Sequence, residues 1–557
     1  MVKIQFKPYD QRQLPLFSST LDEKIPLQHP VRIINHIIDG LDLTVMDQTY
    51  QCGGTTPYNP RMLLKVVVYA YLNNIYSCRK IADLTQYHIH YMWLSGNQNP
   101  SYSTINRFRS EHIKYYINQL FVQIVELLVE KGLISLDVQY IDGTKIESVA
   151  NKYTFVWRKS VERYKGRLIE KINNILEQIE AGIAQDNQDE CESISNNIDS
   201  SSLQAIIDTL NQNNKVINCE TKEAIQQKSK VKKQLTQLQK HQQKLHKYET
   251  DLQTLGNRNS YSKTDKSATF MRMKEDSVNN PQTKPGYNVQ IGTEEQFITN
   301  FGIYYNPGDT LTLIPFLSLN KLRFNRLPKT ICADAGYGSE QNYEVMDINK
   351  IEAYVKYNYY YRDQQKAYRE DIFRAENFYY NEQKNYFVCP MGQHLQFIQE
   401  REIINDNGYK STYKVYAANN CQDCPMKEKC TKEDNRAIVI NLRLLNYKKK
   451  ACELLNSEQG IKHRKKRSIE PESVFGQLKF NMGYKRFRHR GFDKIQMDFG
   501  LLAIAFNLKK MCKKLSYQHF FFFFQQKSLK NRRKNCLFGV LLGFSLKNEN
   551  CLPKIVA

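Results

Sequence analysis

Two short apolar segments, each carrying an aspartate next to a glycine-containing turn, constrain the fold of this chain most. From residue 133 on, the pattern changes, and apolar and polar residues alternate with a period of two through residue 140, which predicts a half-buried strand that ends at Asp142. Residues 327–334 form a second predicted strand, which ends at Asp334. Other predicted elements include a strand at 297–304 and helices at 60–72, 309–317 and 338–346. In such α/β arrangements sites form at the carboxyl ends of strands. The sequence therefore predicts an α/β fold with a carboxylate at each of two strand ends.

The pattern of predicted elements divides the 557 residues into seven segments. Apolar residues at three- and four-residue steps, followed by leucines at seven-residue steps, predict a long helical hairpin or coiled coil inserted into the α/β domain. Five consecutive phenylalanines mark a C-terminal tail that lacks this patterning. The expected segments are a helical, DNA-binding domain (1–128), a first core segment (129–156), the helical insertion (157–257), a second core segment (258–375), a cysteine-bearing insert (376–440), a third core segment with a basic helix (441–515) and a low-complexity tail outside the fold (516–557).

The charge of the chain points to a polyanionic partner. Eighty Lys and Arg against 57 Asp and Glu give a formal net charge of +23, and binding of phosphates by such cations releases condensed counterions. A basic protein without a nucleic-acid role is the alternative. The chain shows no signal peptide, no apolar run long enough to span a bilayer and no phosphate-binding loop for ATP. We therefore expect a cytoplasmic, nucleoid-associated protein that binds DNA and neither a membrane nor ATP.

Three carboxylates have the local context of a metal site. Asp142 and Asp334 lie at predicted strand ends, whereas Glu472 and Lys479 are seven residues apart and would project from one face of a helix. Val474, Phe475 and Leu478 would cover the opposite, buried face of that helix. Mg²⁺ or Mn²⁺ prefers such oxygen ligands, and two ions held together can activate the attacking oxygen and stabilise the leaving oxygen in phosphoryl transfer. Lys479 would hold a phosphate nearby. The alternative is that each carboxylate is an ordinary surface or helix-capping residue.

Four cysteines form a second candidate metal site. Cys421 and Cys424 have the two-residue spacing that lets both thiolates reach one tetrahedral Zn²⁺, and Cys389 and Cys430 would complete four ligands. Reduced cysteines in a turn-rich insert are the alternative.

Two groups of basic residues are candidates for DNA binding. Arg107 and Arg109 lie near a predicted helix start, as in a helix-turn-helix domain, although a plain helical bundle would give the same pattern. The others flank Glu472 on both sides, where cations would grip phosphates and neighbouring aromatics would stack on bases: Lys465, Lys466, Arg467, Lys485, Arg486, Arg488 and Arg490.

Three strings in this order resemble the DDE transposases of bacterial insertion sequences: Tyr-Ile-Asp-Gly-Thr-Lys-Ile-Glu at 140–147, Cys-Ala-Asp-Ala-Gly-Tyr-Gly-Ser at 332–339 and Glu-Pro-Glu-Ser-Val-Phe-Gly-Gln-Leu-Lys at 470–479. The similarity includes the segments 58–64, 285–290 and 483–491, and it covers roughly residues 25–512. It implies an RNase H-like fold whose metal-binding triad is Asp142, Asp334 and Glu472, with Lys479 as the lysine of the Glu-x6-Lys element. Similar transposases often carry cysteines between the second aspartate and the glutamate, which supports the zinc site.

The resemblance has two departures. The family places an arginine four residues before the glutamate, where this chain has Ser468, and Arg467 lies one step away. Glu470 is close enough to be confused with the catalytic glutamate, but only Glu472 has a lysine at the family spacing.

The expected function is a transposase that cuts element ends and joins the 3′-hydroxyls to target DNA, as a homodimer or larger synaptic complex. The alternatives are a nuclease of the same fold that does not join strands, and an inactive protein that binds DNA ends.

Overall fold

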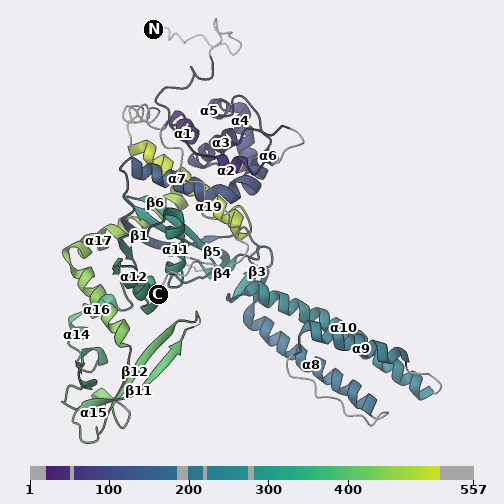
Figure 1. Ribbon diagram of the computed structural model, residues 1–557, viewed down its shortest axis with the longest axis vertical. Coiled ribbons are helices and arrows are strands. Elements are labelled where there is room, and N and C mark those ends of the chain that lie inside the picture. Colours follow the sequence, from purple (N-terminus) through teal and green to yellow (C-terminus); the bar gives the residue numbers. More distant parts are fainter. Residues whose placement is uncertain are drawn as a thin grey trace, which may run out of the picture.

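A mixed sheet forms the centre of the molecule (Figure 1). A computed structural model describes residues 20–50, 56–184, 198–216, 222–273, 282–405 and 407–514. The strand order is β4-β5-β1-β7-β8, and β6 pairs with β5. The pairings of β5 with β4, β6 and β1 are antiparallel, whereas β1, β7 and β8 pair in parallel. The strand bounds are β1 Val138–Glu147, β4 Thr269–Arg272, β5 Thr283–Glu294, β6 Phe297–Tyr304, β7 Thr330–Ala333 and β8 Glu352–Val355.

The first of these strands differs from its sequence prediction at both ends. It begins at Val138 rather than at residue 133, because Leu136 has a left-handed backbone (φ 64°) and the backbone N–H groups of Ser135 and Leu136 donate to the Glu294 carboxylate instead of to a neighbouring strand. It then continues through Asp142, so Asp142 lies inside the strand, and the expectation that Gly143 turns the chain there is wrong.

Helices cover the sheet in two groups. The first group comprises α11 (Leu313–Phe324) and α12 (Glu340–Ile348), with a short 3-10 turn, η2 (Ala335–Tyr337), after β7. The predicted helix from residue 309 begins only at Leu313, because residues 309–312 form a turn in which the Thr312 N–H donates to the Asp309 carbonyl. The C-terminal group comprises α16 (Leu442–Asn456), α17 (Glu458–Ile469), α18 (Pro471–Gly476), the π turn η4 (Gln477–Asn481) and α19 (Phe492–Lys514).

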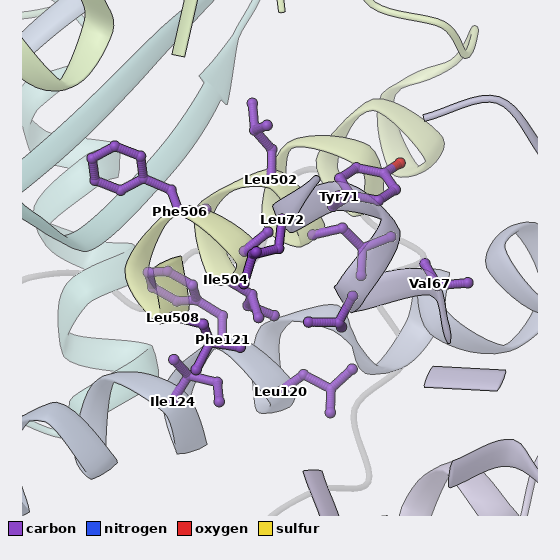
Figure 2. Packing of buried hydrophobic residues seen from close by; sticks show 14 of the residues in the cluster. Val67, Tyr71, Leu72, Leu120, Phe121, Ile124, Leu502, Ile504, Phe506 and Leu508 are labelled. Atoms are coloured by element: carbon purple, nitrogen blue, oxygen red, sulfur yellow. The ribbon is translucent and has the colours of Figure 1, made fainter. Parts of the chain in front are cut away.

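Helix α19 is buried on all sides between the sheet and the N-terminal helices. Its residues from Met497 to Leu508 are all buried, as expected for a helix without a solvent-facing stripe. Figure 2 shows Ile504 and Leu508 of α19 directed toward side chains of two N-terminal helices, whereas Leu502 and Phe506 point away from these helices. The N-terminal elements are α1 (Pro30–Asp39), α2 (Thr44–Asp47), α3 (Pro60–Leu72), α4 (Cys78–Tyr87), α5 (Ile89–Leu94), α6 (Tyr102–Arg107), the π turn η1 (Phe108–Ile113) and α7 (Lys114–Glu130).

A helical arm projects from the sheet beside β3 (Figure 1). The described helices of this arm are α8 (Arg158–Ala184), α9 (Ser200–Val216) and α10 (Lys222–Leu255), where α10 packs against both α8 and α9. Two short paired strands, β2 (Phe155–Trp157) and β3 (Ser260–Ser262), close its base. The arm has its own apolar core, which includes Ile172 and Leu238. It therefore contains a third helix in addition to the predicted hairpin.

A second, antiparallel sheet has the order β13-β12-β11-β10-β9. The sequence interpretation did not assign these strands. Their bounds are β9 Tyr379–Asn381, β10 Tyr386–Val388, β11 His394–Ile404, β12 Lys410–Ala418 and β13 Ala437–Ile440, and the short helices around them are α13 (Tyr360–Asp363), α14 (Lys366–Arg369), η3 (Ala375–Asn377) and α15 (Lys427–Cys430). The expected tail after residue 515 lies outside the described residues.

A buried charge network joins α19 to the N-terminal helices. The Arg109 Nη2 lies 2.9 Å from the Asp498 Oδ1, with side-chain exposures of 1% and 0%. The hydroxyls of Tyr71 and Tyr484 also donate to the Asp498 carboxylate. Burial lowers the pKa of His489 to about 4, so its neutral ring can accept from Arg109, whose Nη2 lies 2.8 Å from the His489 Nε2. The network gives the buried Asp498 carboxylate donors from three side chains, as buried charged groups require.

We expect Asp498→Asn to destabilise the protein by roughly 3–5 kcal/mol, because it leaves the buried Arg109 charge uncompensated. Urea denaturation followed by circular dichroism measures this change. Asp347→Asn is the matched control, since Asp347 pairs with Lys450 at 3.2 Å with both side chains more than half exposed, and its loss should cost about 0–1 kcal/mol. Equal, small shifts of the two variants would contradict a structural role for the network.

Candidate active site

The parallel pairing of β1 and β7 brings the two predicted aspartates together. Tyr140 on β1 is in register with Cys332 on β7. Asp142 and Asp334 each follow two residues after this pair, so both lie at the same edge of the sheet. The Asp142 Oδ1 accepts from the Gly143 N–H at 2.9 Å, and the Asp334 Oδ1 accepts from the Gly336 N–H at 2.9 Å. Each carboxylate is thereby oriented by a backbone N–H of its own segment.

Glu472 reaches this edge from the first turn of α18. Pro471 occupies the first position of the helix, where its missing N–H costs no hydrogen bond. Val474, Phe475 and Leu478 are buried as the sequence predicts, and they hold α18 and η4 against the core. Glu472 itself is exposed. The helix is regular only to Gly476, but a π turn continues it to Lys479, whose Nζ donates to the Thr144 hydroxyl on β1.

A single guanidinium, that of Arg467 on α17, connects the three carboxylates. Its Nη2 lies 3.6 Å from the Asp142 Oδ1 and 3.5 Å from the Asp334 Oδ2, and its Nη1 lies 3.9 Å from the Glu472 Oε1. The Arg467 side chain is only 13% exposed, and its Nε is buried without a hydrogen-bond partner. The sequence interpretation placed Arg467 on a phosphate-binding surface. In the structure this arginine instead provides the positive charge between the three carboxylates.

Glu470, the competing glutamate, lies in a different environment. Its carboxylate is buried, accepts from the Gln296 N–H at 2.6 Å and lies 3.9 Å from the Lys466 Nζ. Burial raises the pKa of Glu470. Lys466 also pairs with Glu295. These contacts fix Glu470 in the turn between α17 and α18, and they involve none of the three carboxylates that Arg467 connects.

The site contains a fourth carboxylate, Asp309, which sequence reasoning missed. Its Oδ1 accepts from the side-chain amides of Asn288 at 2.8 Å and Gln290 at 2.7 Å, both on β5. Burial and the charge of Asp309, followed by those of Asp142 and Asp334, raise the pKa of the Tyr337 hydroxyl. The available signal was a Gly-Asp pair in the loop after β6, where the sequence pattern instead suggested the start of a helix.

The chemistry of these residues fits divalent cations. Carboxylate oxygens are the ligands that Mg²⁺ and Mn²⁺ prefer, and the Arg467 guanidinium stands in for a cation among them. As the side chains lie, however, no group of three or more His, Cys, Asp or Glu residues in the described ranges has an arrangement that could hold a metal ion. An ion would therefore require Arg467 and the carboxylates to move relative to one another.

The four predicted cysteines line one pocket at the end of the second sheet. All four are free thiols. The Cys389 Sγ accepts from the Gln393 N–H at 3.3 Å, and the Cys421 Sγ accepts from the Arg436 N–H at 3.5 Å. Backbone donors of this kind stabilise thiolates that bind a metal. The donor set therefore fits zinc in its chemistry, although the positions of these described cysteines do not form a ligand shell.

The predicted DNA-binding residues have different surroundings. Arg107, Lys465, Lys485, Arg488 and Arg490 are exposed. Arg486 donates to the Ser148 and Ala150 carbonyls and pairs with Glu147. Arg109 is a core residue, so the expectation that it contacts DNA is wrong. The sequence pattern does not indicate the burial of Arg109, because its partner Asp498 lies nearly 400 residues later and no local spacing indicates such a partner.

None of the helices in the described part of the chain is long and apolar enough to cross a membrane.

Two family models match the sequence. A Transposase domain family matches residues 19–111, and a Transposase DDE domain family matches residues 388–512. No curated protein and no solved structure matches the chain.

The two matches lie in segments that the fold brings together. The first covers most of the N-terminal helices, and the second contains the four cysteines, Arg467, Glu472, Lys479 and nearly all of α19. Together, the two matched domains indicate a DDE-type transposase of insertion sequences.

Proposed function

We propose that this transposase cuts DNA at the ends of an insertion sequence and joins the 3′-hydroxyl ends to target DNA by two-metal phosphoryl transfer. Asp142, Asp334 and Glu472 would hold the ions. The observation that carries this proposal is the contact of one guanidinium with all three carboxylates, which come from a β-strand, a strand end and a helix. A mixed sheet in which parallel strands continue an antiparallel meander supports the expected RNase H-like core.

The proposed chemistry requires no ATP, because one phosphodiester replaces another. Mg²⁺ or Mn²⁺ would lower the pKa of the attacking water or 3′-hydroxyl and stabilise the leaving oxygen. The residues of the chain would supply orientation. Lys479, held at the edge of β1 by Thr144, would bind a phosphate beside Glu472. The backbone N–H donors at Gly143 and Gly336 would keep the two aspartates pointed at the ions.

We propose that DNA lies along the exposed cations on the segment between η4 and α19. Lys485, Arg488 and Arg490 are exposed there, and the Arg488 guanidinium lies over the ring of Tyr76, next to α4. Arg107 and Lys465 would extend the surface. These residues would bind phosphates without reading sequence. Simultaneous cutting of two ends would require a homodimer or larger synaptic complex, acting at the nucleoid.

Two alternative functions share some features of this site. A nuclease of the same fold would nick end-containing DNA in Mg²⁺ without joining it, and an inactive end-binding protein would do neither. Incubation of the protein with end-containing DNA and Mg²⁺, resolved on a denaturing gel, separates the three outcomes through nicked and joined products.

We expect Asp142→Asn, Asp334→Asn and Glu472→Gln each to lower nicking by at least about 10³-fold, because each removes a charge that holds the ions while keeping the size of the side chain. Binding of end DNA, measured by gel shift, should remain within a few-fold of the wild type. Glu470→Gln is the matched control and should still nick. An inactive Glu470→Gln together with an active Glu472→Gln would reverse the assignment of the glutamate.

Arg467→Gln should raise the affinity for Mn²⁺ in the absence of DNA by roughly tenfold, or about 1.4 kcal/mol, because the guanidinium repels a cation from the same carboxylates. Calorimetric titration measures this change. Arg464→Gln is the control, since Arg464 lies on the same helix over the ring of Tyr360. A lower Mn²⁺ affinity for Arg467→Gln would show that the arginine assembles the carboxylates rather than competing with the ion.

We also propose that the four cysteines bind one zinc ion in a structural site. Purified protein should carry about one zinc per chain by elemental analysis, and the double variant Cys421→Ser, Cys424→Ser should lose it and unfold the surrounding segment at a lower temperature. Cys452→Ser, a free cysteine on α16, should keep the metal. Freshly purified, unchelated protein without zinc would rule the site out.

A further inference from the structure

We propose that Asp309 is a fourth carboxylate of the metal site and supplies an oxygen beside Asp334. This inference rests on the proposed function, because it concerns the same ions. Asp309 is not one of the expected triad residues, and it lies in the turn between β6 and α11 rather than on a strand or a catalytic helix.

The glycines beside the two aspartates place Asp309 between them. A Cβ at Gly143 would lie 2.6 Å from the Asp309 Oδ1 and 2.3 Å from the Gln290 Nε2. A Cβ at Gly336 would lie 3.0 Å from the Asp334 Oδ1 and 3.7 Å from the Asp309 Oδ2. Gly143 follows Asp142 directly, and Gly336 follows Asp334 by two residues. Because neither glycine has a side chain, Asp309 can lie against both the segment that follows Asp142 and the segment that follows Asp334.

The two oxygens of Asp309 have different surroundings. Oδ1 accepts from both amides of β5, and Gln290 is held in turn by Asn288 at 3.1 Å and by the Tyr337 hydroxyl. Oδ2 lies on the side of Gly336 and Asp334. A carboxylate with one oxygen fixed by neutral donors and the other on the side of the Asp334 loop has the orientation that hydrogen-bonded ligands of metal sites show.

The backbone of the Asp309 turn is fixed to the Asp334 loop. The Thr310 hydroxyl donates to the Gly336 carbonyl at 2.7 Å, and the Asn342 amide on α12 donates to the Thr310 carbonyl at 2.9 Å. The Asp309 carbonyl accepts from the Thr312 N–H and hydroxyl. Asp309 and Asp334 therefore keep their relative position without a metal.

A surface role explains these observations less well. An exposed aspartate would be solvated, whereas Asp309 is half-buried and its Oδ1 accepts from two side-chain amides, of Asn288 and Gln290, which are themselves 1% and 0% exposed. Arg467 pairs with the other three carboxylates, and its contacts within 4 Å do not extend to Asp309. An ion near Asp334 would supply the positive charge beside Asp309 that Arg467, which does not contact Asp309, does not provide.

The test is Mn²⁺ titration of the full-length protein with end DNA, monitored by the electron paramagnetic resonance of free Mn²⁺. Asp309→Asn should weaken Mn²⁺ binding by about 10- to 100-fold relative to the wild type, and the thermal midpoint without metal should stay near that of the wild type. Asp347→Asn, at an exposed site on α12 away from these carboxylates, is the matched control. Wild-type Mn²⁺ affinity and stoichiometry in Asp309→Asn would overturn the inference.

Two further variants separate the possible failures. Asp309→Ser removes the oxygen beside Asp334 without placing an amide there, so it gives the same measurement if Asp309→Asn does not fold. Unchanged Mn²⁺ binding by Asp309→Ser would again overturn the inference. If Asp142→Asn loses Mn²⁺ while Asp309 variants keep it, only the role of Asp309 fails. If the wild type binds no Mn²⁺ with end DNA, the proposed two-metal function itself fails.

Discussion

The burial of α19 is the constraint on which the rest of the structure depends. This helix has no solvent-facing stripe through its central turns, so it can be stable only when the sheet covers one side and the N-terminal helices cover the other. The π turn and loop that precede α19 connect it to α18, which carries Glu472. The packing of the N-terminal helices against α19 thus also fixes where the glutamate meets the two sheet aspartates. The Arg109–Asp498 pair makes this packing specific, because an unpaired charge at this depth would be costly.

Negative charge at one edge of the sheet is the second constraint. Four carboxylates from four different segments approach each other there, and in the absence of metal their repulsion is offset by Arg467 and by hydrogen-bond donors. The lysine at the same edge donates to Thr144 on β1, whereas the guanidinium pairs with all three residues of the triad. In the proposed mechanism, a metal ion would replace the guanidinium among these carboxylates. DNA phosphates would offer the displaced arginine a new partner.

Local patterns predicted much of this site. The alternation before Asp142 and the apolar run before Asp334 indicated two strands, and α3 and β6 have the bounds that their sequence patterns indicated. The positions of Val474, Phe475 and Leu478 indicated the buried face below Glu472 correctly. The sequence could not indicate that Asp142 lies inside its strand, because the pairing with β5 that extends the strand involves residues almost 150 positions later.

The residues that sequence reasoning missed depend on contacts between distant segments. Asp309 has no motif around it, and its place in the site depends on two amides from β5 and on the space left by Gly143 and Gly336. Arg109 and Arg467 both belong to basic stretches that predict solvent exposure. Each of them is instead largely buried, and each forms an ion pair with a carboxylate that is far away in the sequence. The second sheet was missed because its strands lie in a segment whose cysteines and aromatics suggested turns.

The central claim is that the carboxylates at this sheet edge hold the ions that drive phosphoryl transfer. A crystal structure of the protein with end DNA and Mn²⁺, with anomalous difference density collected at the manganese edge, tests this most directly. We predict anomalous peaks bounded by Asp142, Asp334 and Glu472, with the Arg467 side chain turned away from them. Manganese bound elsewhere, or Arg467 still in contact with all three carboxylates in the DNA complex, would contradict the claim.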